Sequence, residues 1–265
     1  MTTETAPSND SPPASSRPRL TVVVPAYQEG STIAHALERM REVFDTLGRT
    51  YEVLLVSDGN TDGTETAAKG VDFPQLEVFH YAPNRGKGYA LRFGFERARA
   101  DIVAFIDGDL DIHPSCVLAL LAQLEATDAD AVIGSKVHPD SEVVYPMFRR
   151  FQSRVFRTFI RSLFRLDVTD TQTGCKVLRR QVLDTCLPHV QSDGFAFDLE
   201  LLVLANDAGY RVTEGPIALD YQFSSSTGIH AVGHVLREVF SLARRRSASR
   251  RAGTWLAPIT QQPIS

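Results

Sequence analysis

Three aspartates at alternate positions directly follow a short apolar run. The run Ile102–Ile106 is rich in β-branched residues and predicts a buried strand, and the segment after it reads Asp107-Gly108-Asp109-Leu110-Asp111. In an extended segment these carboxylates lie on one side, where they repel one another unless a cation sits among them. Oxygen ligands suit Mg²⁺ or Mn²⁺, and a metal with open positions suits a diphosphate. We expect a metal site at Asp107, Asp109 and Asp111; the alternative is an acidic surface turn.

Length and composition describe an ordinary soluble protein. The chain has 265 residues, 43% of them hydrophobic and 23% charged, and a net charge of -4 that argues against general nucleic-acid binding. Its three cysteines have no CxxC spacing, which fits a reducing cytoplasm. No secretory signal is recognisable, and no run of about 18 apolar residues predicts a membrane span. We expect a cytoplasmic protein that can touch a membrane surface.

Strands and helices alternate through the first half. The predicted strands are 20–25, 51–56, 75–81, 102–106 and 129–134. The predicted helices are 31–47, a short one after the turn at 58–64, 86–99 and one after Pro114. This order predicts an α/β fold with a mostly parallel sheet and helices on both faces. Ligands bind at the carboxyl ends of such strands, where the polar motifs fall. A nucleotidyltransferase is the rival of another class, but it would carry a Gly-rich loop after the first strand.

The second half contains two basic segments. The range 147–166 predicts an amphipathic helix with phenylalanines opposite an arginine stripe made of Arg150, Arg154, Arg157, Arg161 and Arg165. Such a helix can lie in a membrane interface, or it can pack its apolar face on the core and leave its arginines solvated. The later cluster is Arg244–Arg246, Arg250, Arg251 and Trp255. It suits either an anionic membrane surface or a disordered basic tail.

Seven short motifs together resemble one family. They are VPAYQE at 24–29, SDGNTDGT at 57–64, NRGKG at 84–88, DGDLD at 107–111, GSK at 134–136, DTQTGCK at 170–176 and FDLEL at 197–201. Their order and spacing, from about residue 21 to 244, resemble the inverting glycosyltransferase family 2, which has the Rossmann-like GT-A fold. The nearest resemblance within it is to polyprenol-phosphate (dolichyl-phosphate) mannosyl- and glucosyltransferases.

The resemblance implies roles for individual residues. Nucleotide-sugar binding is implied for Pro25, Ala26, Tyr27, Glu29, Asp58, Arg85, Lys87, Asp107 and Lys136. Catalytic roles are implied for Asp109, Lys176 and Asp198, and contact with the acceptor phosphate for Asp170 and Lys176, to which the helical stripe adds Arg150, Arg154 and Arg157. Asp107 and Asp109 match the family's metal pair, whereas Asp111 stands where relatives often carry Gln. Lys136 replaces the usual Arg.

The implied activity is inverting, metal-dependent transfer of a hexose from a nucleotide-diphospho-sugar to a polyprenyl phosphate at the cytoplasmic face of a membrane. UDP-glucose is expected over GDP-mannose, and no nucleic-acid partner is expected. The alternative is a hydroxyl acceptor on a cell-wall glycan or secondary metabolite, which needs Asp198 or Glu200 as a base. We expect a disordered tail at 1–19, a catalytic domain at 20–246 with nucleotide-sugar (20–136) and acceptor (137–246) halves, and a flexible basic tail at 247–265.

Overall fold

A seven-stranded sheet organises the protein. The computed structural model describes residues 17–141, 158, 160–194, 196–219, 229–253 and 255–256, with only the backbone for 229–236. Within these ranges the strand order is β3-β2-β1-β4-β6-β5-β7. The strands are β1 (Leu20–Ala26), β2 (Tyr51–Asp58), β3 (Leu76–Tyr81), β4 (Ile102–Ile106), β5 (Ala131–Ser135), β6 (Cys175–Arg179) and β7 (Val212–Pro216). Every neighbouring pair is parallel except the two that involve β6, so the mostly parallel sheet is confirmed.

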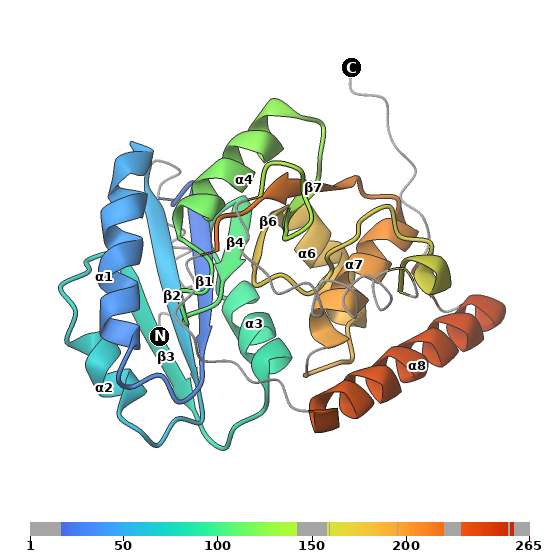
Figure 1. Cartoon of the computed structure of the whole chain (residues 1–265), viewed down its shortest axis with the longest axis horizontal. Coiled ribbons are helices and arrows are strands. Elements are labelled where there is room, and N and C mark those ends of the chain that lie inside the picture. Colours follow the sequence, from blue (N-terminus) through green and yellow to red (C-terminus); the bar gives the residue numbers. More distant parts are fainter. Residues whose placement is uncertain are drawn as a thin grey trace, which may run out of the picture.

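Helices cover both faces of the sheet. They are α1 (Ile33–Phe44), α2 (Thr64–Lys69), α3 (Lys87–Phe95), α4 (Ser115–Ala126), α6 (Arg180–Cys186), α7 (Ala196–Ala208) and α8 (Ile229–Ala252), with 3-10 turns at Asp45–Leu47 and Leu187–His189. Figure 1 shows α1 and α2 beside β3 at one end of the molecule and α8 at the other. Strand β1 is apolar throughout its middle because Val22 and Val24 face one core and Val23 faces the other.

Local sequence explains where the first elements begin and end. In α1 the buried residues Ile33, Leu37, Met40 and Phe44 recur at the spacing of one helical face, as predicted. The helix begins at Ile33, two residues after the predicted start, and its chain turns away at Gly48, whose φ of 63° is in the left-handed region. The α1 face packs on β1 and β2 together with α4.

Strand β6 departs from the predicted alternation. It runs antiparallel between β4 and β5, with Phe105 opposite Lys176 and Ile106 opposite Cys175. The chain therefore returns through the sheet from its carboxyl edge, and the motif at 170–176 arrives beside the aspartate loop that follows β4. The motif's neighbours in space are thus residues about 65 positions earlier in the chain.

A third core lies under α8. Ile133, Leu199, Val203, Val239 and Leu242 meet in it, together with Ile160, Phe164, Leu166, Val168 and Leu202. Helix α8 thus closes a hydrophobic layer against α7. The expected boundary at residue 246 falls inside α8, which runs on to Ala252. The expected tails at 1–16 and 257–265 lie outside the described residues.

Candidate active site

The loop after β4 places Asp107 and Asp109 at the carboxyl edge of the sheet, but not in an extended segment. Leu110 has a φ of 58°, and the Asp111 amide donates a hydrogen bond to Asp109 Oδ1 at 3.0 Å, so the chain turns after Asp109. A non-glycine residue in the left-handed region is uncommon and clusters at functional sites. The turn breaks the alternation that would align Asp111 with the other two. Burial raises the pKa of Asp111, whereas the nearby Lys136 opposes that shift.

Glu29 joins these aspartates from the loop after β1. A methyl group on Gly108 would lie 2.4 Å from Glu29 Oε2, so the glutamate reaches directly over the aspartate loop. Burial raises the pKa of Glu29 to about 8, and repulsion from Asp109 and Asp107 adds to this shift. Its buried Oε2 atom accepts no hydrogen bond from the part of the chain that the structure describes. We call Glu29, Asp107 and Asp109 the acidic group.

Lys87 supplies a positive charge to the acidic group. It is the first residue of α3, and its Nζ lies 2.6 Å from Asp107 Oδ1. Burial lowers the pKa of this lysine, but Asp107 and Asp198 outweigh burial and the net pKa is raised. Burial and Asp107 likewise raise the pKa of Asp109, which Lys87 offsets only in part. The acidic group thus holds more negative charge than its lysine compensates.

This charge excess fits a divalent cation. Asp107, Asp109 and Glu29 offer the hard oxygen atoms that Mg²⁺ and Mn²⁺ prefer. Two of these atoms, Glu29 Oε2 and Asp107 Oδ1, accept no hydrogen bond in the described parts of the chain, although Asp107 Oδ1 has its ion pair with Lys87. Within the described residues, no three His, Cys, Asp or Glu side chains are already gathered around a metal position. A metal held here would therefore have to take further ligands from a bound substrate.

Asp58 organises the loop that carries Arg85 and Lys87. It is only 2% exposed. Its Oδ1 accepts from the Arg85 amide at 2.7 Å, and its Oδ2 accepts from the Gly86 amide and the Asn84 side chain, both at 2.9 Å. Three of the roughly four acceptor positions of the carboxylate are thereby used inside the protein. Contact between Asp58 and a nucleotide base stays a prediction; the role of Asn84 in this loop was not predicted.

The loops after β1 and β2 are joined by side chains of the SDGNTDGT motif. Asn60 Nδ2 donates to the Ala26 carbonyl at 3.1 Å, and the Gly30 amide donates to Asp62 Oδ2 at 2.7 Å. A methyl group on Gly59 would lie 2.2 Å from the Asn84 backbone nitrogen. Only glycine at this position therefore allows the loop after β3 to approach the loop after β2. Beside these loops the ring of Tyr27 is 53% exposed and free to stack on a ligand.

Arg85 and Lys136 stand at the margins of this edge. The Arg85 guanidinium lies 3.5 Å from the ring centroid of Tyr89. The Lys136 amide donates to Asp170 Oδ2 at 2.9 Å, and Glu214 in turn accepts from the Asp170 amide at 2.8 Å. Asp170 is 8% exposed, and its carboxylate would repel a phosphate. The structure therefore gives Asp170 a role in ordering the loop of Lys136, through a Glu214 contact that the sequence did not suggest.

Lys176 and Asp198 form an ion pair inside the protein. Lys176 Nζ lies 2.9 Å from Asp198 Oδ1 and donates to the Thr173 carbonyl at 2.7 Å. The lysine side chain is 0% exposed and the aspartate side chain 6%. In this conformation the Lys176 side chain has no surface open to an incoming phosphate, and the Asp198 carboxylate is held in an ion pair. Sequence patterns did not suggest this burial because lysine is rarely fully buried.

The two other acidic residues of α7, Glu200 and Asp207, bind arginines of α8. Glu200 is fully buried, and its Oε1 lies 2.8 Å from Arg245 Nη1. Asp207 is 2% exposed and accepts from Arg246 Nε at 2.7 Å and from Trp255 Nε1 at 2.8 Å, with Arg250 Nη2 2.7 Å away. Arg245, Arg246, Arg250 and Trp255 are therefore docked on α7 instead of forming a flexible tail.

The predicted basic helix is described only at its C-terminal end. Arg150, Arg154 and Arg157 lie outside the described residues. In the described part Ile160 and Phe164 are buried in the third core, whereas Arg161 and Arg165 are exposed. For this end of the helix, the apolar face packs on the protein core, which is the alternative to membrane insertion.

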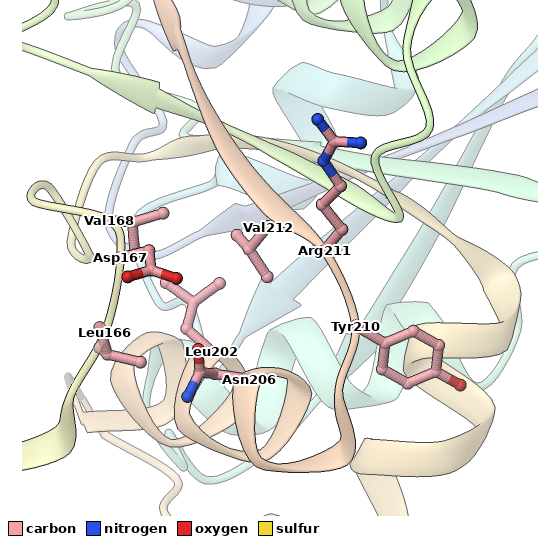
Figure 2. Close-up of a pocket in the computed structure, with 8 residues that line it drawn as sticks. All are labelled: Leu166, Asp167, Val168, Leu202, Asn206, Tyr210, Arg211 and Val212. Carbon is pink, nitrogen blue, oxygen red and sulfur yellow. The ribbon is translucent and has the colours of Figure 1, made fainter. Parts of the chain in front are cut away.

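A small pocket lies away from the acidic group. Its volume is about 80 Å³, and it is lined by Leu166, Asp167, Val168, Leu202, Asn206, Tyr210, Arg211 and Val212 (Figure 2). Val212 is the first residue of β7, so the pocket lies toward the amino ends of the parallel strands. In sheets of this kind ligands bind at the opposite edge.

Across the described residues, no helix combines the length and apolarity needed to cross a bilayer.

The sequence of this chain is similar to those of known glycosyltransferases. Residues 21–187 match the model of the family described as glycosyl transferase family 2. The glycosyltransferase AglD of Haloferax volcanii is 29% identical over 221 residues, which cover 82% of this chain and 35% of that protein. The dolichyl-phosphate beta-glucosyltransferase of Saccharomyces cerevisiae is 27% identical over 220 residues, 75% of this chain and 66% of the relative. The chain thus spans about one to two thirds of these relatives' lengths.

A solved structure confirms the fold class. Glucosyl-3-phosphoglycerate synthase from Mycobacterium tuberculosis, in complex with uridine diphosphate, superposes with a TM-score of 0.67. The match covers 93% of this chain and 83% of that one at 20% identity. At this identity the likeness concerns the arrangement of strands and helices, including the predicted α/β layering.

Proposed function

Because this chain belongs to glycosyl transferase family 2, we propose that it transfers a hexose from a nucleotide-diphospho-sugar to a polyprenyl phosphate, with inversion at the anomeric carbon. The observation that carries this proposal is the acidic group at the carboxyl edge of the sheet, whose negative charge exceeds the positive charge of its neighbour Lys87. The names of the dolichyl-phosphate beta-glucosyltransferases of yeast and of Drosophila melanogaster support the acceptor class.

The nucleotide-sugar would lie against the loops after β1, β2 and β4. Asp107 and Asp109, with Glu29 beside them, would hold Mg²⁺ or Mn²⁺, and a bound metal of this kind neutralises a departing diphosphate. Arg85 and Lys87 add fixed positive charge for the same diphosphate. Pro25, Ala26, Tyr27 and Asp58 would line the base and ribose. Structures of glucosyl-3-phosphoglycerate synthase from M. tuberculosis, which has a similar fold, have been solved with UDP and Mn²⁺ or Mg²⁺. These structures support a uridine nucleotide for this chain.

A phosphate acceptor suits the remaining residues better than a hydroxyl does. A phosphomonoester has its second pKa near about 6, so it is already a nucleophile at neutral pH and needs no strong base. A hydroxyl acceptor needs a base, for which Asp198 and Glu200 were the candidates. Both are sequestered in ion pairs with Lys176 and Arg245. Lys136 lies close enough to Asp111 to offset part of the rise in the pKa of that carboxyl, and we assign this lysine to the reacting phosphates.

A lipid acceptor also implies contact with a membrane surface. Along α8, Arg237, Arg244 and Arg251 are exposed and recur every seven residues, so they lie on one stripe of the helix. Arg245 and Arg246 point the other way, toward α7, so the stripe is held by a docked helix. We assign this outer stripe to binding of the anionic cytoplasmic surface of a membrane, where each arginine contributes about 1 kcal/mol to the binding free energy.

A transfer assay tests the proposed function directly. The purified protein is given UDP-glucose or GDP-mannose, with Mg²⁺ or Mn²⁺ and either polyprenyl phosphate or the unphosphorylated polyprenol. We expect transfer from UDP-glucose to polyprenyl phosphate alone, with a product whose anomeric configuration, read by NMR, is opposite to that of the nucleotide-sugar. Transfer to the polyprenol, or to a glycan hydroxyl but not to the lipid phosphate, would favour the hydroxyl-acceptor alternative.

The membrane assignment has its own test. Arg237→Glu combined with Arg244→Glu should reduce co-sedimentation with anionic liposomes at least about ten-fold, because two attractive charges of about 1 kcal/mol each become repulsive. A control with the same change in net charge, Arg39→Glu with Lys69→Glu on α1 and α2, should bind as the unchanged protein does. Equal loss in both variants would mean that net charge alone, and not α8, determines binding.

A further inference from the structure

A fully buried lysine next to an active site needs a physical reason. Lys176 stands in the middle of the sheet on β6, opposite Phe105 of β4, and has no exposed surface. Burying two charges has a large desolvation cost, and apolar residues of similar size are often at least as stable. The pair with Asp198 is therefore poorly explained by stability alone. What its members hold in place is more informative.

On one side Lys176 holds the wall behind Asp107. Its Nζ binds the carbonyl of Thr173 at 2.7 Å, and the next residue, Gly174, accepts a hydrogen bond from the Asp107 amide at 2.9 Å. A methyl group on Gly174 would lie only 1.9 Å from Asp107 Oδ2. The Asp107 carboxylate thus rests directly against the backbone that Lys176 ties down.

On the other side Asp198 lies close enough to Lys87, the cation that pairs with Asp107, to raise the pKa of that lysine. Asp198 attracts Lys87 electrostatically, in addition to its contact with Lys176. The two ammonium groups flank one ring, with Lys87 Nζ at 5.7 Å and Lys176 Nζ at 4.8 Å from the centroid of Phe105. The start of α7 also packs on α3, because a methyl group on Gly88 would lie 2.5 Å from Phe197 Cβ.

We propose that Lys176 and Asp198 are positioning residues for the nucleotide-sugar site: together they fix Asp107 and Lys87 and do not contact the acceptor. Lys176 sets the Gly174 wall against which Asp107 rests, and Asp198 balances the pull of Asp107 on Lys87. This inference rests on the proposed function only in taking Asp107 and Lys87 to bind the metal and diphosphate. It removes Asp198 from the list of bases and Lys176 from the list of phosphate contacts.

The test separates positioning from stability. The variants are Lys176→Met, Asp198→Leu and the two combined, which replaces the ion pair by an apolar pair. For each we measure the melting temperature and, by calorimetry without acceptor, the Kd of UDP and of GDP in the presence of Mn²⁺. We expect both single variants to melt lower because each leaves a buried charge unpaired, and the combined variant to recover much of that loss.

Nucleotide binding should not recover with stability. The combined variant still lacks the tether to Thr173, so its Kd for the nucleotide with Mn²⁺ should stay about 10-fold or more above that of the unchanged protein, the size typical for residues that orient metal ligands. Recovery of both quantities would overturn the proposal and make the pair purely structural. If the combined variant does not fold, Asp198→Asn decides: unchanged nucleotide affinity in it overturns the proposal, and weakened affinity supports it.

Kinetics distinguish the remaining roles. A variant with unchanged nucleotide affinity and a loss in kcat alone would identify Asp198 as the base, and a rise in the acceptor KM alone would identify Lys176 as a phosphate contact. Arg246→Met is the matched control, since it breaks another buried pair 2.5 Å long that belongs to α8 and α7. It should lower the melting temperature and leave the Kd unchanged. Because binding is measured without acceptor, a different acceptor would refute the proposed function and leave this result standing.

Discussion

The acidic group and helix α7 hold their buried acids in opposite ways. In the nucleotide-sugar half, Glu29, Asp107 and Asp109 crowd together around one lysine, and repulsion and burial raise the pKa of Glu29 to about 8. In the acceptor half, each buried acid of α7 has a basic partner of its own. The same residue type thus has two uses. An acid with its own cation fastens one element to another, whereas acids without enough cations form a place for a cation from outside.

The largest effect should come from removing a member of the acidic group. Asp109→Ala should lower the transfer rate by about three orders of magnitude, the loss typical of removing a strong electrostatic stabiliser of the reacting groups. Initial rates measured with added Mn²⁺, and after chelation by EDTA, check this. Asp111→Ala, in the same loop but beyond the turn, is the control and should lose far less. Equal losses would place Asp111 inside the acidic group after all.

The next largest effect should come from removing an acid that joins two helices through ion pairs. Asp207→Ala leaves Arg246, Arg250 and the Trp255 indole without their acceptor. Breaking a buried pair from one side destabilises a protein by about 3–5 kcal/mol. Thermal unfolding should therefore show a melting temperature lower by roughly 10 °C. Nucleotide affinity should be unaffected at temperatures where the variant is folded. The exposed Asp184, 3.9 Å from Arg180, provides the contrast, and Asp184→Ala should change stability little.

Asp58 tests the boundary between the two uses. It lies in the nucleotide-sugar half, yet it fastens a loop with three hydrogen bonds to Asn84, Arg85 and Gly86. Losing charge-assisted hydrogen bonds worth about 1.5–3 kcal/mol should weaken nucleotide binding by about one to two orders of magnitude in Asp58→Ala. Calorimetry with UDP and GDP measures this. Unchanged affinity for both would show that the loop of Arg85 and Lys87 does not contribute to binding.

The smallest effect should have the opposite sign. Because the pKa of folded Glu29 is about 8, this side chain must take up a proton on folding at neutral pH, which costs stability. Glu29→Gln removes that cost, so the metal-free protein should become more stable by about 1 kcal/mol at neutral pH. Affinity for Mn²⁺ should fall several-fold at the same time. Denaturant unfolding and a metal titration give the two values, with Glu38→Gln on the exposed face of α1 as control. A loss of stability in Glu29→Gln would contradict the distinction between the halves.

The part of this fold that follows from sequence is the part built from adjacent segments. The apolar runs of β1, β2, β4 and β5 and the helical spacing of α1 can be read from residues close in sequence. These elements were therefore correctly predicted as strands or as a helix. Strand β6 was not, because nothing in Cys175–Arg179 reveals its direction or its place between β4 and β5. The motifs predicted which residues gather at the sheet edge. They did not predict that Lys176 is buried or that Asp58 binds its neighbouring loop, because both depend on partners distant in sequence.

The insertion of β6 has a consequence for the order in which this protein is made. The wall behind Asp107 comes from Gly174, 67 positions later by number, so a ribosome has released β1 to β5 before that wall exists. Contacts between such distant segments form late and slowly in folding. We expect that a fragment ending at residue 136, although it contains all the expected nucleotide-sugar residues, binds no nucleotide. If the fragment does not bind, neither half can be exchanged as a separate module.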